Sequence, residues 1–103
     1  MVLSEENAQA HNSLGWIALK KGDAAAAQQH FERALQLDPN LMEAYINLGM
    51  LYKQASDYTR ARANFETFLA RASPKKDRDS IPRIKKELAE VIQRQQTPAS
   101  RGK

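Results

Sequence analysis

Apolar side chains recur at helical spacing along most of this chain, and short polar segments interrupt the pattern. The first run is expected to form a helix that Ser4 caps and that extends to about Lys21. Gly22 then ends this helix, and Asp23 caps a second one that extends to about Leu37. The pattern therefore predicts an all-α protein that begins with a helical hairpin.

The helical pattern stops at Asp38-Pro39-Asn40 and then starts again. Pro39 has no backbone N–H to donate and restricts the conformation of Asp38, so it separates two units. Asn40 and Glu43 are expected to form a capping box at the start of the third helix, and Asp57 to cap the fourth. A second hairpin is thus expected to follow the first.

The two hairpins are copies of one another. A shift of the sequence by 34 residues aligns eight identical pairs: Ala10 with Ala44, Leu14 with Leu48, Gly15 with Gly49, Asp23 with Asp57, Ala27 with Ala61, Phe31 with Phe65, Glu32 with Glu66 and Leu35 with Leu69. A fixed period of this size is typical of helical repeat proteins. Gly15 and Gly49 weaken a helix, so they are expected where two helices meet closely, Gly15 with Ala27 and Gly49 with Ala61. Phe31 and Phe65 are expected to supply bulk to the layer between the two units.

The chain resembles the tetratricopeptide repeat family in this period, in Pro39, and in the motifs His11-x-x-Leu14-Gly15, Tyr45-x-x-Leu48-Gly49-x-x-Tyr52, Ala27-x-x-x-Phe31 and Ala61-x-x-x-Phe65. The resemblance covers residues 8 to about 73. It implies two repeats, at about 8–41 and 42–75, whose antiparallel helix-turn-helix units stack into a right-handed α-α superhelix. Three residues depart from the family's usual pattern: His11, Ala18 and Phe68.

A fifth helix is expected at about 80–96, where the pattern changes. Its apolar stripe consists of Ile81, Ile84, Leu88, Val91 and Ile92. Its other face is expected to lie in water and carries Arg83, Lys85, Lys86, Glu87, Glu90 and Arg94. We interpret it as a capping helix that completes a domain of residues 1–96, followed by a disordered tail at 97–103.

The run Leu14 to Leu19 is too apolar for a helix with one buried face. Leu14 and Ala18 are expected to face the partner helix of the hairpin, whereas Trp16 and Leu19 lie on another stripe. In the family this stripe lines a concave surface that binds peptides, and the resemblance implies the same here. The expected groove consists of Asn12, Trp16, Leu19, Lys20, Ile46, Asn47, Met50 and Lys53.

The sequence leaves several functions open. A protein-interaction adaptor or scaffold is the first interpretation, with Trp16 as a binding anchor. The alternative is that Trp16 and Met50 pack on each other or on a neighbouring segment. Because repeat arrays generally need about three units, the apolar first helix also fits self-association, or a missing preceding repeat. A third possibility is that the chain is the C-terminal accessory domain of a larger protein whose catalytic part lies elsewhere.

The residue composition and the lack of known catalytic motifs reduce the number of possible functions. The chain lacks cysteine, a phosphate-binding glycine loop, an HExxH pair and a GxSxG elbow, so it is not expected to be an enzyme or to hold a cofactor. His11 is expected to replace a packed aromatic residue and His30 to lie on the surface, with no third metal ligand. The chain is expected to be soluble and cytoplasmic, with no membrane association.

The positive charge is concentrated in the last third of the chain. Residues 73–103 hold nine Lys/Arg and four Asp/Glu, whereas residues 1–72 hold seven and eight. Nucleic-acid binding by this part is a further alternative, but it lacks interleaved aromatic residues, which favours a solvated helix face.

Overall fold

The computed structural model describes residues 7–96, and five α-helices make up this part of the chain. They are α1 (Ala8–Lys20), α2 (Ala24–Leu37), α3 (Met42–Gln54), α4 (Tyr58–Arg71) and α5 (Ser80–Gln96). The predicted fold class and the expected number of helices are therefore confirmed. The expected tail at 97–103 lies outside the described residues.

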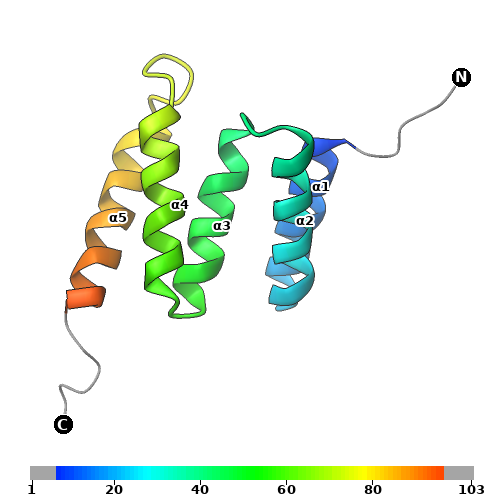
Figure 1. The fold of residues 1–103 in the computed structure, drawn as a ribbon, viewed down its shortest axis with the longest axis horizontal. Coiled ribbons are helices and arrows are strands. Elements are labelled where there is room, and N and C mark those ends of the chain that lie inside the picture. Colours follow the sequence, from blue (N-terminus) through cyan, green and yellow to red (C-terminus); the bar gives the residue numbers. More distant parts are fainter. Residues whose placement is uncertain (1–6, 97–103) are drawn as a thin grey trace, which may run out of the picture.

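The helices form two hairpins and a capping helix. α1 packs on α2, α3 packs on α4, and α2 joins the hairpins through its contact with α3. Figure 1 shows α3, α4 and α5 side by side, with the pair of α1 and α2 at the other end. α5 packs on α4, so it covers the second hairpin as the sequence predicted.

Each hairpin is held by a phenylalanine that packs on a glycine of the opposite helix. A Cβ atom on Gly15 would lie 2.6 Å from Cε1 of Phe31, and one on Gly49 would overlap Phe65. Phe31 and Phe65 have no exposed surface. The predicted close approach at both glycines is confirmed, and it explains why a residue that weakens helices stands in their middle. Phe31 and Phe65 meet these glycines within each hairpin, whereas the sequence analysis placed them in the layer between the units.

The N-terminal caps agree with the prediction in α2 and α4 and differ in α1 and α3. Asp23 accepts a hydrogen bond from the amide of Ala26, and Asp57 accepts one from the amide of Arg60, as expected. α1, however, begins at Ala8 with Asn7 as its cap. The expected start at Ser4 is wrong, because the Asn7 side chain already accepts from the amide of Ala10; Ser4 itself lies outside the described residues.

The expected capping box of α3 does not form. The N-cap residue is Leu41, which makes no side-chain cap. Asn40 instead donates its backbone N–H to the Asp38 carboxylate, and Glu43 accepts a hydrogen bond from Asn12 of α1. The inter-repeat turn therefore uses Asp38 to order Asn40, which leaves Glu43 available to join the two repeats.

One side chain of α1, Leu14, lies on a different side of the helix from the one predicted. Leu14 is 47% exposed, so it does not lie against α2 as expected. Ala18 is partly buried against the core, as predicted. The reason is angular, because Leu14 lies about 100° around the helix from Gly15, the residue that meets Phe31.

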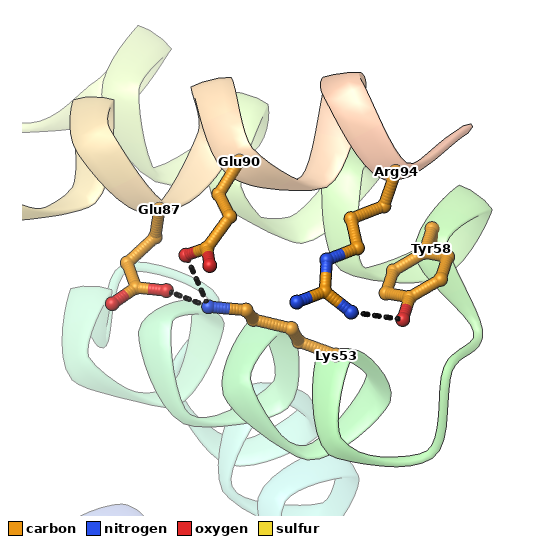
Figure 2. A network of polar contacts seen from close by, with 5 residues as sticks. All are labelled: Lys53, Tyr58, Glu87, Glu90 and Arg94. Carbon is orange, nitrogen blue, oxygen red and sulfur yellow. Dashed lines mark hydrogen bonds and ion pairs between the residues drawn. The ribbon is translucent and has the colours of Figure 1, made fainter. Parts of the chain in front are cut away.

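The polar face of α5 is not uniformly in water. Ile84 and Val91 are fully buried, as predicted. Glu87 and Glu90, however, bind Lys53 of α3, and Arg94 donates to the hydroxyl of Tyr58 (Figure 2). The expectation that these three side chains only face solvent is wrong, since helix periodicity alone does not reveal a second neighbouring helix.

Candidate partner-binding groove

An open groove of about 670 Å³ lies along α1 and α3 and reaches the start of α5. Seven of the eight residues expected from the sequence line it, and Lys53 does not. The structure adds Ser13, Ile17, Glu43, Gln54, Ser80 and Arg83. Ser13 and Gln54 could have been predicted, because they lie one helical turn from Trp16 and Met50 on the same helices. Arg83 could not be inferred, because its position depends on how α5 docks.

Trp16 is the large apolar surface of this groove. Trp16 is 48% exposed, whereas Met50 is partly buried against the core. The ammonium nitrogen of Lys20 lies 4.8 Å from the centre of the indole ring, a cation–π arrangement between residues four positions apart on α1. The groove thus offers an aromatic face with a positive charge at its edge.

A row of polar side chains fixes the floor of the groove. Asn12 is 7% exposed and accepts a hydrogen bond of 2.9 Å from the Asn47 side chain. Its own amide group donates to Glu43 at 3.4 Å. Because a buried amide without partners would be costly, these bonds favour one arrangement of α1 against α3. Asn12 and Asn47 therefore hold the groove in shape.

Lys53 connects α3 to α5 beside the groove. Its ammonium nitrogen lies 2.5 Å from an oxygen of Glu87 and 2.7 Å from an oxygen of Glu90. Desolvation by burial acts against the charged form of Lys53, but the hydrogen bonds and charges of Glu87 and Glu90 outweigh it, and the pKa of Lys53 is raised. The hydrogen bond from Lys53 in turn lowers the pKa of Glu90. Both groups are therefore held in their charged forms.

The two histidines meet between α1 and α2. Nδ1 of His11 lies 3.1 Å from Nδ1 of His30, and both side chains are partly buried. The expected surface position of His30 is wrong, because its ring meets that of His11 across the hairpin, with the ring centroids 5.3 Å apart. Within residues 7–96, no group of three His, Asp or Glu side chains is arranged to hold a metal ion.

The 34-residue hairpins and the Gly–Phe contacts agree with the comparison to known families. Descriptions of the tetratricopeptide repeat match residues 8–41 and 30–63, which together span more than half of the chain. The chain belongs to the tetratricopeptide repeat family. Repeats of this family generally mediate protein–protein interactions and typically act as scaffolds without catalytic activity.

Two curated proteins are similar to this chain. The uncharacterized protein ycf37 of Pyropia yezoensis is 32% identical over 62 residues, which are 60% of this chain and 35% of that protein. Anaphase-promoting complex subunit 3 of Schizosaccharomyces pombe is 34% identical over 73 residues, which are 71% of this chain and 10% of that protein. The chain thus spans a small part of each relative. Among its described helices, none is long and apolar enough to cross a membrane.

Proposed function

We propose that this chain is a protein-interaction module that binds a peptide segment of a partner protein in the groove along α1 and α3. The observation that carries the proposal is the half-exposed indole of Trp16 in an open groove with a polar, hydrogen-bonded floor. Tryptophan is among the residues that contribute most to binding at protein interfaces. One relative is, by its name, a subunit of a multiprotein complex, which is compatible with such a role.

The chemistry of the groove suggests the kind of peptide. Trp16 and Met50 would contact a large apolar side chain, since the aromatic face is rigid and methionine adapts to irregular partners. Lys20 and Arg83 also line the groove, and their positive charges would favour an acidic residue in the peptide. Lys53 would act indirectly, because its ammonium group binds Glu87 and Glu90 and thereby positions α5 beside the groove.

The affinity for a single peptide is expected to be modest. Two repeats and part of α5 offer a short surface, and ordering a flexible peptide costs free energy. A dissociation constant on the order of micromolar follows for an interface of this size. A partner that also contacts another part of the module would bind more tightly through its effective local concentration.

Trp16 makes the test direct, because it is the single tryptophan of the chain. A displayed library of peptides is selected on the full chain, and selected peptides are titrated while the Trp16 emission is followed. Binding in the groove should shift the emission to shorter wavelength, because the indole leaves water. Leu37→Ala is a matched control, since Leu37 is exposed on α2 and does not line the groove.

The variant Trp16→Ala should weaken the selected peptides by at least roughly tenfold while the helical circular dichroism signal is unchanged. Met50→Ala should weaken them less, and Leu37→Ala should leave them as they are. Peptides that bind Trp16→Ala as tightly as the original chain would refute the groove proposal. Loss of the helical signal in Trp16→Ala would assign Trp16 to the core instead.

A further inference from the structure

The two histidines of the chain face one another across the first hairpin. His11 lies on α1 and His30 lies on α2, 19 positions later in the sequence. Their Nδ1 atoms are 3.1 Å apart, and the two rings, whose centroids are 5.3 Å apart, are tilted by 31° to each other. Both residues are partly buried, so the hairpin holds the rings in place and water still reaches them.

The repeat fold does not require such a pair. One repeat later, Tyr45 and Asn64 occupy the positions of His11 and His30. The Tyr45 hydroxyl donates to a backbone carbonyl in the preceding turn, and the Asn64 side chain donates to a backbone carbonyl within α4. The second hairpin therefore forms with other residue types at these positions, and packing alone does not explain the two imidazoles of the first.

The separation of the two nitrogens is close to that of two ligands on one metal ion. Zinc lies about 2.0–2.1 Å from an imidazole nitrogen, so two such nitrogens around a tetrahedral ion are about 3.3 Å apart. The Nδ1 atoms of His11 and His30 lie 3.1 Å apart. The hairpin thus already holds two imidazole nitrogens at a spacing that one ion can bridge.

The protons of the pair are compatible with this role. Without an ion, one neutral ring donates its Nδ1–H to the Nδ1 lone pair of the other ring, which carries its own proton on Nε2. When an ion binds, the shared proton moves to Nε2 of its own ring, and both Nδ1 lone pairs face the ion. No proton leaves the pair, so the chain binds the ion without a change in its own charge.

We propose that His11 and His30 bind one divalent transition-metal ion of the kind that prefers imidazole ligands, such as Zn²⁺, Ni²⁺ or Cu²⁺. Each histidine supplies Nδ1. The part of the chain that the structure describes contains no group of three His, Asp or Glu side chains that could hold an ion, so water completes the coordination. Neither histidine lines the groove, so this site is separate from the proposed peptide-binding function.

The bound ion joins α1 to α2. Because it binds the folded hairpin through both helices, it stabilises the folded chain, including the helix that carries Trp16. Two protein ligands bind less tightly than the four of a structural zinc site, so binding is reversible. Cu²⁺ should bind more tightly than Ni²⁺ or Zn²⁺, and Mg²⁺, which prefers oxygen ligands, should not bind.

The full chain, without an added histidine tag, is titrated with Ni²⁺ and with Zn²⁺ in an isothermal calorimeter. A slightly alkaline buffer is used, because neutral imidazole is the form that binds metal. One ion per chain is expected, and the same titration with Mg²⁺ should give no binding. Thermal melts with and without Zn²⁺ should show a higher Tm in the presence of the ion.

Two variants taken from the second repeat test the ligands. His30→Asn and His11→Tyr place the residue types of Asn64 and Tyr45 on the first hairpin, so both are expected to keep the helical signal. Each should raise the dissociation constant of Ni²⁺ at least roughly tenfold, since losing a mere partner of a metal ligand already has such an effect. Glu32→Gln is the control, because it removes an exposed carboxylate on the opposite side of α2 and should bind Ni²⁺ normally.

A measurement on the unchanged chain does not depend on how the variants fold. In ¹⁵N-labelled protein, the imidazole resonances should show both rings with their proton on Nε2 when Zn²⁺ is bound. A response of only one ring would overturn the proposal, as would equal affinity for Ni²⁺ in the original chain and in either histidine variant. No binding, or binding that leaves Tm unchanged, would mean that the two imidazoles only bond each other.

Discussion

The ammonium group of Lys53 lies within 2.7 Å of the Glu90 carboxylate, which joins α3 to α5 across 37 residues of sequence. Glu87 contributes a second carboxylate to the same nitrogen (Figure 2). Lys53 is mostly covered, with 20% of its side chain exposed. This small network therefore orients the capping helix, and with it the end of the groove where Ser80 and Arg83 lie.

Glu90→Gln should lower Tm by a few degrees at neutral pH, and the effect should disappear in acid. The hydrogen bond from Lys53 lowers the pKa of Glu90 in the folded chain below its ordinary value of 4.5. A carboxyl group with a lowered folded pKa stabilises above its unfolded pKa, and this contribution is lost as the pH falls through the folded pKa. Thermal melts of both proteins from neutral pH to below pH 4 check the prediction.

The control measures the effect of Glu90→Gln on Tm in a chain that already carries Lys53→Met. Without the ammonium group, Glu90→Gln should have little effect at any pH, because the exposed carboxylate has lost its main partner. If the original chain and its Glu90→Gln variant instead differ in Tm by the same amount at every pH, the ion pair does not stabilise the contact of α5.

Gly15→Ala should destabilise the chain by about 1–3 kcal/mol, although alanine is the better helix former by about 1 kcal/mol. The new Cβ atom would lie 2.6 Å from Phe31 and 3.1 Å from the carbonyl oxygen of Ala27, so the two helices must separate. Urea denaturation measures the change. Phe31→Leu, made together with Gly15→Ala, should cost less than the sum of the two single changes, because the smaller side chain relieves the overlap.

Ser56→Gly should stabilise the chain by about 1 kcal/mol, because a left-handed backbone conformation is unfavourable for a residue with a side chain. Ser56 has φ of 62° and stands one repeat after Gly22, which has φ of 87°. Both residues end a helix in the same way, because the backbone N–H of the following residue donates to a carbonyl five residues earlier. Asp23 donates to Ala18 in the first repeat, and Asp57 donates to Tyr52 in the second. Gly22→Ser is the converse change and should destabilise by a similar amount in the same urea experiment.

The sequence predicted features that recur in both repeats. The 34-residue shift predicted which helices form hairpins, and the two glycines predicted where those helices meet closely. The Asp23 and Asp57 caps followed from local chemistry. These features depend on neighbours within one repeat, where spacing alone determines which side chains meet.

Several of the errors concern residues whose surroundings involve a different repeat or α5. Glu43 was expected to cap its own helix, but Asn12 of the preceding repeat binds it. Glu87 and Glu90 were assigned to solvent, but α3 supplies Lys53. Leu14 has the same residue type as Leu48 and was expected to be covered by its own hairpin. Residue type does not reveal whether a neighbouring helix is present, so such positions need the three-dimensional arrangement.

Leu14 and Leu48 provide a matched pair that tests whether a neighbouring helix, and not the residue type, determines the contribution of a leucine to stability. The two residues are identical and occupy the same repeat position, but their exposed fractions are 47% and 4%. Leu48→Ala should cost about 2–5 kcal/mol of the free energy of unfolding, because it leaves a cavity in the hydrophobic core. Leu14→Ala should cost less than about 1 kcal/mol, since water already reaches the side chain. Urea denaturation of the two variants at several protein concentrations measures both values. A large, concentration-dependent cost for Leu14→Ala would mean that copies of the chain cover this residue in solution.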